Sequence, residues 1–421
     1  MTGARPKRLP RFLAVAILAL GYATTLVVAR AGRWRPRSRV LPRGRIAMVG
    51  TFHNPNWILS HAIPLARSGA ESVLVVGDVS LPPRDNIRFV HPPAWLRRLA
   101  GRALSKVLWL LAVGRRERPD LYVGLHLFPG ALSALIVARL LGRPACYQMT
   151  GGPVEIAGGG VANENWLMAS LARPSPLVER LALAVVREFE LVVALGRKAT
   201  TFLEERGVKG VVAIIPGSIA PPAPPPDSGR TIDLVFVGRL TDIKQPLRFV
   251  DVVAETQKAH GALRAAIVGD GPLLADVKRR VADLGLDETV DVLGQRDDVD
   301  LIVRRSKVFV LTSRSEGLSI AMTEAMAAGA VPVVADVGEL GDLVDPGRNG
   351  FLVEPRDTAA YARHIGALLA DAQLRTRLSQ ATEQDARGHV GREAVAARWG
   401  RAVQRVGAMP ASPLLQQGVG G

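Results

Sequence analysis

The sequence predicts an α/β protein made of two doubly wound halves, with an apolar helix ahead of the first half. Short apolar segments alternate with helix-like segments in two series, which a proline-rich stretch at 216–229 separates. The strand expected at 308–311 leads through a polar loop into a helix, and the next strand follows at 331–335. This order is typical of a parallel sheet with helical crossovers. A run of eighteen uncharged residues at 12–29 precedes both series.

The composition limits the classes of protein to consider. The 421 residues suffice for two domains of ordinary size, and 48% hydrophobic with 22% charged residues is typical of globular proteins. The net charge of +16 is uneven, because residues 1–45 hold eleven Lys and Arg and no Asp or Glu, leaving 43 basic and 38 acidic residues elsewhere. This distribution argues against a nucleic-acid-binding protein. The single cysteine, Cys146, excludes internal disulfide bonds and a cysteine-based zinc site.

The apolar run at 12–29 predicts a membrane anchor within an N-terminal domain at 1–45. Its length is at the short end for a spanning helix. A cleaved signal peptide is the other interpretation, but the A-x-A match at 29–31 has Arg30 in its middle. Seven arginines follow the run and four basic residues precede it, so the positive-inside rule keeps the large domains cytoplasmic. A shallow insertion that leaves both flanks on one side stays open. The arginines should also attract anionic lipid headgroups.

The first alternating series predicts an α/β domain at 46–215. One expected helix, at 94–113, interleaves apolar and basic side chains: Trp95, Leu96, Leu99, Leu104 and Trp109 with Arg97, Arg98, Arg102 and Lys106. It is either a membrane-facing surface that recruits a lipid-linked acceptor or an ordinary helix with an apolar core face.

The second series predicts an α/β domain at 230–390. Five prolines between positions 221 and 226 indicate that 216–229 is a linker. The strands expected at 234–237, 265–268, 290–293, 308–311 and 331–335 are mainly apolar, as in a parallel sheet covered on both faces. A helix is expected within 391–407, and residues 408–421 predict a disordered tail.

Two glutamates with seven residues between them mark the candidate site of the second domain. Glu316 falls in the polar loop after the strand at 308–311, and Glu324 falls in the helix that Gly329 ends. This loop and helix N-terminus lie at the carboxyl edge of a parallel sheet, where doubly wound folds bind nucleotides. The ordinary alternative makes Glu316 a solvated loop residue and Glu324 a salt-bridge partner within its helix.

The string S-R-S-E-G-L-S-I-A-M-T-E-A-M-A-A-G at 313–329, with V-F-V-G-R-L-T-D-I-K at 235–244, closely resembles the retaining glycosyltransferases of family 4. These have the GT-B fold, in which two Rossmann-like domains face a cleft. The resemblance covers roughly residues 45–406. It implies that the first domain binds the acceptor, that the second binds a nucleotide diphosphate sugar, and that the helix at 391–407 crosses back to the first domain.

The resemblance also implies roles for donor-site residues. Arg239 and Lys244 would contact the diphosphate, where fixed cations stabilise the charge that builds on a leaving phosphate. Glu316 would face the donor sugar, and Glu324 would hold the ribose hydroxyls, since one carboxylate accepts from two vicinal hydroxyls. No DxD triplet stands in a convincing loop, so neither a metal ion nor a cofactor is expected. The remaining donor-binding candidates are Gly238, Gly269, Gly271, Gln295, Gly317, Leu318 and Ser319.

Candidate acceptor residues come from the loops of the first domain. The segment that contains His126 aligns with a strand and the following helix of the family, so His126 is either a pocket residue or an ordinary histidine without a ligand. Thr150 stands where many members have a histidine, which puts that histidine's role in doubt here. Gly151 and Glu155 belong to a glycine-rich segment at 150–165 that is either a mobile acceptor loop or merely disordered. His53 is either an acceptor or phosphate ligand or a solvated loop histidine.

These observations predict a membrane-anchored retaining glycosyltransferase that serves cell-surface polysaccharide or glycolipid biosynthesis. Its expected partners are a nucleotide sugar, a membrane-associated or lipid-linked acceptor and membrane lipids. A catalytically silent GT-B subunit of a polysaccharide assembly complex and a GT-B nucleotide-sugar epimerase are the alternatives. The base, sugar, acceptor, linkage and oligomeric state do not follow from the sequence.

Overall fold

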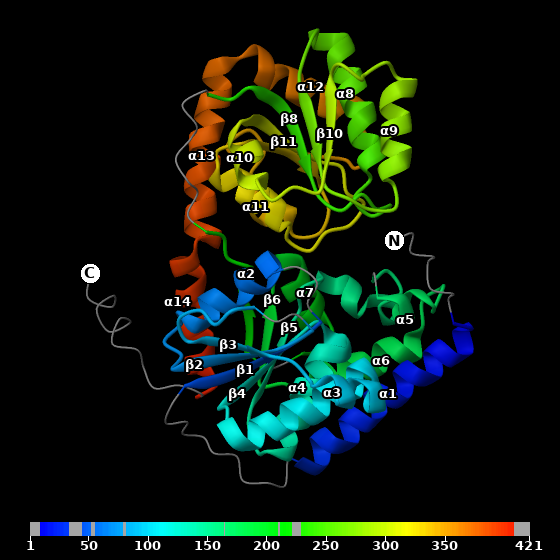
Figure 1. The fold of residues 1–421 in the computed structure, drawn as a ribbon, viewed down its shortest axis with the longest axis vertical. Coiled ribbons are helices and arrows are strands. Elements are labelled where there is room, and N and C mark those ends of the chain that lie inside the picture. Colours follow the sequence, from blue (N-terminus) through cyan, green and yellow to red (C-terminus); the bar gives the residue numbers. More distant parts are fainter. Residues whose placement is uncertain are drawn as a thin grey trace. The chain divides into compact units, whose positions relative to one another are not determined.

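The computed structural model describes residues 9–32, 44–51, 55–78, 81–163, 165–208, 211–220 and 229–407 (Figure 1). The chain divides into two compact units, one of Met1–Ser218 with Val395–Gly421 and one of Ile219–Ala394. Most of the expected linker, at 221–228, and the expected tail, at 408–421, lie outside the described residues.

The first unit is built on a seven-stranded sheet in the order β3-β2-β1-β4-β5-β6-β7. All neighbouring strands are parallel. Parallel neighbours require crossover connections, which the helices between the strands supply. The strands are β1 (Arg45–Val49), β2 (Ser72–Val76), β3 (Ile87–Val90), β4 (Leu121–Leu125), β5 (Ala145–Gln148), β6 (Leu191–Ala194) and β7 (Val211–Ile214).

Helices cover both faces of this sheet, and two separate apolar clusters fill the space between helices and strands. The helices of this part are α1 (Arg11–Gly32), α2 (Pro55–Ala66), α3 (Ala94–Glu117), α4 (Leu132–Leu140), α5 (Trp166–Ala169), α6 (Pro176–Val186) and α7 (Arg197–Glu205), with short turns η1 (Leu127–Ala131), η2 (Gly152–Glu155) and η3 (Ala157–Gly159).

Helix α1 is an outer layer of the first unit. It packs on α4 and α6, and α4 packs on β4. Its buried side chains recur about every fourth residue, at Ala14, Leu18, Tyr22, Leu26 and Ala29, which is the spacing of one helix face. The expected anchor segment therefore contributes one face to the core of the first unit.

The last helix, α14 (Arg392–Arg405), also belongs mainly to the first unit. Trp399 is fully buried, and it shares an apolar cluster with Ile46 and Met48 of β1. This large side chain gives the C-terminal helix a fixed place on the sheet of the first unit.

The second unit is built on a six-stranded parallel sheet in the order β10-β9-β8-β11-β12-β13. Its strands are β8 (Ile232–Val237), β9 (Ala265–Val268), β10 (Val290–Gly294), β11 (Ser306–Leu311), β12 (Val331–Ala335) and β13 (Phe351–Val353). Its helices are α8 (Pro246–His260), α9 (Leu274–Asp283), α10 (Val299–Arg304), α11 (Ile320–Ala327), α12 (Thr358–Ala370) and α13 (Ala372–Val390), with the turn η4 (Leu340–Asp342).

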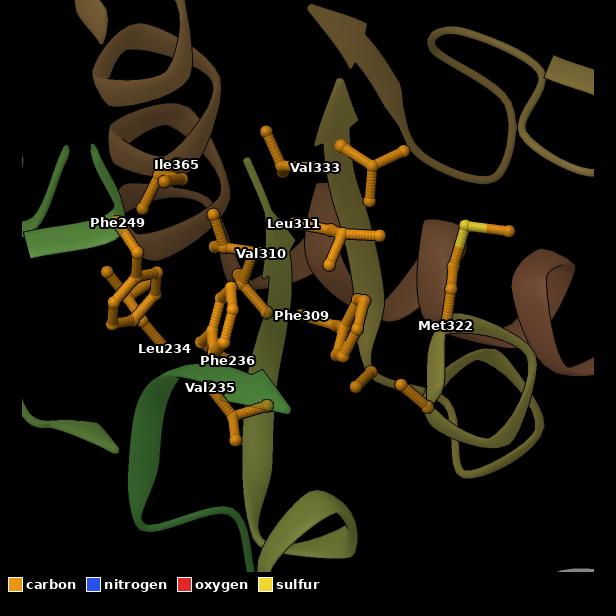
Figure 2. Packing of buried hydrophobic residues seen from close by; sticks show 14 of the residues in the cluster. Leu234, Val235, Phe236, Phe249, Phe309, Val310, Leu311, Met322, Val333 and Ile365 are labelled. Atoms are coloured by element: carbon orange, nitrogen blue, oxygen red, sulfur yellow. The ribbon is translucent and has the colours of Figure 1, made fainter. Parts of the chain in front are cut away.

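Apolar side chains of the central strands pack on both faces of this sheet. Figure 2 shows Phe236 of β8 and Phe309 of β11 among neighbours from the helices, with Met322 of α11 and Ile365 of α12 in the same cluster. Strands covered on both faces need continuous apolar runs, which the sequence shows. The predicted fold class, two doubly wound parallel sheets behind an apolar N-terminal helix, is confirmed.

Candidate functional site

The order of strands places a candidate site between β8 and β11. The chain runs outward from β8 through β9 to β10 and then returns to β11 on the other side of β8. Crevices at such a reversal, outside the carboxyl ends of the strands, are where open α/β sheets bind ligands. The loop after β8 carries Arg239 and Lys244, and the loop after β11 carries Glu316.

Lys244 and Glu316 form an ion pair at this position. The Lys244 ammonium donates to both carboxylate oxygens of Glu316, at 2.7 and 2.8 Å. Ser313, which is buried, donates its hydroxyl to the same carboxylate. Glu316 has 6% of its side chain exposed and Lys244 has 20%, so the cation is the more accessible member. Two of the three predicted catalytic residues therefore meet.

Backbone contacts hold the two loops together. The Thr312 hydroxyl donates to the Gln245 carbonyl at 2.9 Å, and the Arg314 N–H donates to the Ile243 carbonyl at 2.8 Å. The Tyr361 hydroxyl of α12 donates to the Leu311 carbonyl at the end of β11, at 3.1 Å. These bonds fix the separation of Lys244 and Glu316 through the backbone as well as through the ion pair.

Gly269 and Gly271 allow the loops after β8 and β9 to touch. A Cβ atom on Gly269 would lie 1.9 Å from the Gly238 carbonyl oxygen, and one on Gly271 would lie 2.5 Å from the Leu240 carbonyl oxygen. Both glycines also have positive φ, at +143° and +158°. The sequence predicted that glycine here lets backbone approach a ligand. The structure shows close backbone–backbone packing, which by itself requires glycine at both positions.

The loop at Glu316 leads into the N-terminus of α11. Ser319 caps this helix by accepting a hydrogen bond from the Met322 N–H, and the Gly317 carbonyl accepts from the Glu339 N–H at 3.1 Å. A Cβ atom on Gly338 would lie 1.9 Å from the Glu316 carbonyl oxygen, so this glycine lets the loop after β12 cover Glu316. Sequence reasoning missed Gly338 and Ser313. The serine three residues before Glu316 was the available signal.

Glu324 lies on α11 and its side chain is exposed, yet the surrounding protein disfavours the charged form of its carboxylate. The protein atoms around the carboxylate, and secondarily the charge of Asp300, raise the pKa of Glu324 to about 7. Water that reaches the exposed part of the side chain offsets some of this desolvation. The remaining donor candidates Arg239 and Gln295 are exposed at the ends of β8 and β10.

The first unit gathers its predicted residues around a buried carboxylate. Glu155 is 1% exposed, and it accepts hydrogen bonds from the Leu127 N–H at 2.8 Å, the Tyr147 hydroxyl at 2.8 Å, the His126 imidazole at 3.0 Å and the Gly151 N–H at 2.5 Å. Burial acts to raise the pKa of Glu155, but the charge of His126 and these hydrogen bonds outweigh it and hold the pKa below its usual value.

His126 and Thr150 follow neighbouring strands β4 and β5 and lie together above Glu155. Thr150 Oγ1 is 2.8 Å from His126 Nδ1, the nitrogen that donates to Glu155. His126 has a positive φ of 56°, which is uncommon for a residue with a Cβ atom, and its side chain is 38% exposed. The His126 ring also stacks on Trp57 at 5.6 Å. Four predicted acceptor residues thus come together.

A second histidine lies beneath this group. His61 is buried, and its Nδ1 accepts a hydrogen bond from the Gln148 amide at 2.9 Å. Burial, and then the charge of His126, lower the pKa of His61 to about 3, so this imidazole stays neutral at physiological pH. Sequence reasoning did not single out His61, which reads as one polar residue in the apolar stretch of α2.

The glycine-rich segment is packed rather than open along its described part. A Cβ atom on Gly159 would lie 2.9 Å from Val178, and one on Gly160 would lie 2.7 Å from Met168 Sδ. This packing argues against the alternative of a merely disordered loop for residues 150–163, and the interpretation as an acceptor loop stays a prediction. His53 lies outside the described residues. Within the described ranges, no three His, Cys, Asp or Glu side chains converge as metal ligands, and metal independence stays a prediction.

Comparison with protein families and curated proteins identifies relatives of this chain. The family model for glycosyl transferases group 1 matches residues 224–385. The 2-deoxystreptamine glucosyltransferase of Streptomyces kanamyceticus is 30% identical over 355 residues, which cover 75% of this chain and 89% of that protein. An exopolysaccharide phosphotransferase of Streptomyces coelicolor is 29% identical over 191 residues, or 44% of this chain. This chain spans only 20% of the phosphotransferase's length.

Solved structures show the same fold. The structure of Anabaena HepE in complex with UDP matches with a TM-score of 0.66 and 18% sequence identity, over 86% of this chain and 99% of the other. Because this match covers 86% of the chain, the likeness in fold extends beyond residues 224–385, which the family model covers.

Proposed function

This chain belongs to the glycosyl transferases group 1, and we propose that it is a retaining glycosyltransferase that moves a sugar from a nucleotide diphosphate sugar to a membrane-associated acceptor. The observation that carries the proposal is the Lys244–Glu316 ion pair between the carboxyl ends of β8 and β11. Held in one place, the cation can bind a diphosphate and the carboxylate can accept hydrogen bonds from sugar hydroxyls.

Lys244 and Arg239 supply positive charge to the leaving group in this proposal. As the glycosidic C–O bond breaks, its electron pair passes to a phosphate oxygen, and fixed cations stabilise that charge more in the transition state than in the ground state. A diphosphate also offers Lys244 a partner with more negative charge than Glu316. Transfer of the ammonium's hydrogen bonds to phosphate releases the Glu316 oxygens to accept from sugar hydroxyls.

The configuration of the anomeric carbon is retained because the acceptor attacks it from the same face that the leaving group leaves. The acceptor hydroxyl oxygen bonds to the anomeric carbon, and its proton passes to the departing phosphate oxygen, so no protein nucleophile is needed. Glu324 holds the ribose hydroxyls, and no metal ion or other cofactor takes part. Added chelator is expected to leave turnover unchanged. Loss of turnover on chelation would contradict the proposal that the reaction needs no metal ion.

The first unit is proposed to bind the acceptor. In the neutral form of His126, the hydrogen bond to Glu155 holds the ring proton on Nδ1, and the Nε2 atom keeps a lone pair that can accept from an acceptor hydroxyl. Thr150 provides a second polar atom beside it. Uridine diphosphate is the first nucleotide to test, since the HepE structure holds UDP.

Two helices of the first unit, α1 and α3, support the proposal that the chain and its acceptor are associated with a membrane. Among the described residues, α1 is the one helix long and apolar enough to cross a membrane, with a mean hydropathy of 2.3. Helix α3 exposes Trp95 and Leu99 beside arginines. Whether α1 crosses the membrane or lies in its surface, its basic flanks are proposed to keep both units on the cytoplasmic side. Cell-surface polysaccharide or glycolipid biosynthesis is the setting that such an acceptor implies.

The decisive experiment is a thermal shift assay of the full chain with UDP, GDP, ADP and CMP. The matched variants are Lys244→Ala and Lys307→Ala. Lys307 forms an equally short ion pair with Asp233, 2.7 Å, but near the amino ends of β11 and β8. One nucleotide is expected to raise the Tm of the parent and of Lys307→Ala but not of Lys244→Ala.

The alternatives give different outcomes. Absence of any shift with all four nucleotides would favour a catalytically silent subunit. A shift accompanied by turnover of the nucleotide sugar without an acceptor would favour an epimerase. Equal loss of the shift in both lysine variants would show that the Lys244 effect is general destabilisation.

A further inference from the structure

We propose that the outward face of α1, together with the N-terminal half of α3, docks on an anionic lipid bilayer, with α1 lying in the plane of the membrane instead of crossing it. This inference concerns how the first unit meets the lipid, and it holds whether or not the chain transfers a sugar.

Both ends of α1 are tied to the body of the first unit. Just before the helix, the Leu9 N–H donates to the Ser170 hydroxyl at 3.2 Å, and in its first turn the Arg11 guanidinium donates to the Pro174 carbonyl at 3.4 Å. In the last turn, Arg30 lies 3.8 Å from the carboxylate of Glu188. A helix held at both ends lies along the unit, as Figure 1 shows for α1 beside α4 and α6.

The inner face of α1 is a fitted surface. A Cβ atom on Gly32 would lie 2.8 Å from the Cβ atom of Arg139 on α4, so the helix end packs directly on α4. Tyr22 is fully buried, and its hydroxyl is close enough to Glu155 that this carboxylate adds to burial in raising the pKa of Tyr22. A spanning helix would need lipid around it, whereas this one shares a core with the residues that hold His126.

The outer face of α1 is apolar along its whole length. Phe12, Leu20 and Val27 are 71%, 70% and 68% exposed, and Leu13 and Ile17 are exposed between them. A helix of 22 residues is roughly 33 Å long, so this strip is larger than the scattered apolar side chains of an ordinary soluble surface. An exposed apolar strip of this size indicates that another apolar surface covers it.

Helix α3 carries a second exposed apolar set with positive charge among it. Trp95, Leu99 and Leu104 are 63%, 82% and 54% exposed. Arg97, Arg98 and Arg102 are exposed on the same stretch. Both α1 and α3 pack against α4, so the two exposed sets belong to helices that surround α4 in one unit. Tryptophan and arginine at the edge of an apolar surface are typical of the lipid–water interface.

The charges decide which partner fits. Residues 11–32 and 94–116 contain arginines and no Asp or Glu. A second copy of this chain would bring like charges together at such an interface, whereas anionic headgroups complement them. The geometry therefore points to an anionic membrane surface as the occupant.

The first test measures binding of the full chain to vesicles of phosphatidylcholine with and without phosphatidylglycerol. The variant Leu20→Glu/Val27→Glu changes two exposed side chains, so its Tm should equal that of the parent. Leu284→Glu, a control in the second unit, changes an apolar side chain that is 36% exposed. We expect binding to anionic vesicles that added salt weakens, at least ~tenfold loss in the double variant, and no change in the control.

The second test measures the depth of α1 in the bilayer. The single variants Leu13→Cys, Leu20→Cys and Val27→Cys are labelled with an environment-sensitive dye. Lipids that carry quenchers at different depths then report the depth of each labelled position. The native Cys146 is fully buried and escapes labelling. An in-plane helix gives three equally shallow depths. A spanning helix places position 20 at the bilayer centre and the other two near opposite surfaces, which would overturn the proposal. A dimer that the double variant dissociates, without vesicle binding by the parent, would overturn it as well.

Discussion

The two units place a carboxylate at corresponding edges of their sheets but use it differently. Glu316 of the second unit accepts hydrogen bonds from the long side chain of Lys244 and from the hydroxyl of Ser313. Glu155 of the first unit is surrounded by two backbone N–H groups, a phenol and an imidazole. An ion pair with a flexible lysine can exchange partners when a phosphate arrives, whereas four fixed donors cannot. The comparison indicates a carboxylate that acts on a ligand in one unit and a carboxylate that positions other residues in the other.

Lys244→Ala is expected to have the largest effect, because it removes the cation that we propose to meet the leaving phosphate. We predict that kcat falls ~10²–10³-fold, as when one preorganised stabilising group is lost, while the acceptor KM changes far less. Steady-state kinetics with varied acceptor concentration measures both. Lys307→Ala, with its ion pair at the opposite end of β11, should keep kcat within a few fold.

A raised acceptor KM with unchanged kcat in Lys244→Ala would place this lysine away from the phosphate. Glu316 would then no longer differ from Glu155 in having a partner that moves to phosphate.

Gly269→Ala is expected to have the next largest effect, on folding of the second unit. The added Cβ atom would meet the Gly238 carbonyl oxygen at 1.9 Å, and the loop must shift to relieve this contact. We predict that the free energy of unfolding falls by more than ~2 kcal/mol, measured by urea denaturation. Gly285→Ala is the control, since Gly285 also has positive φ but no atom within 4 Å of the added Cβ, and it should cost only ~1 kcal/mol.

Unchanged stability in Gly269→Ala, with a loss of nucleotide affinity alone, would instead show that this glycine serves ligand approach. The donor loops would then be less rigid than the backbone contacts indicate.

Glu155→Gln and Glu316→Gln compare the two carboxylates directly. An amide at position 155 would turn its NH₂ group toward a donor, so we predict a loss of ~1–3 kcal/mol in unfolding free energy. The same change at position 316 keeps an acceptor for Lys244, and its stability should fall by less than ~1 kcal/mol although activity falls. Calorimetry at neutral pH measures both. Equal losses in the two variants would remove the distinction between the units.

The pH dependence of this difference has a fixed sign. The folded-state pKa of Glu155 lies below the usual value of 4.5, so its ionised form contributes stability above pH 4.5. That contribution is lost as the pH falls through the lowered folded-state pKa. The Tm difference between the parent and Glu155→Gln should therefore narrow only below pH 4.5.

The sequence predicted more of the second unit than of the first for a physical reason. Glu316 and Lys244 lie on short loops after adjacent parallel strands, and strand adjacency alone brings such loops together. The role of Glu155 could not be predicted, because its donors come from the segment after β4, from β5 and from Gly151, which packing brings together. The turn that follows Glu155 depends in addition on Val178 and Met168 of other helices. The burial of one face of α1 was equally hidden, since an apolar helix that packs on protein and one that crosses lipid have the same composition.

Glu324 offers the smallest and most specific test of the second unit. Its pKa is raised to about 7, so the carboxylate is neutral below that pH and ionised above it. If the ionised form accepts from ribose hydroxyls, nucleotide affinity should fall as the pH decreases from 8 to 6. The fall should be less than ~tenfold, because water that reaches the exposed side chain reduces the shift. Isothermal titration calorimetry measures the affinity, and Glu324→Gln should flatten the profile. A Glu324→Gln variant that retains the full pH dependence would assign it to another group, because the amide cannot titrate.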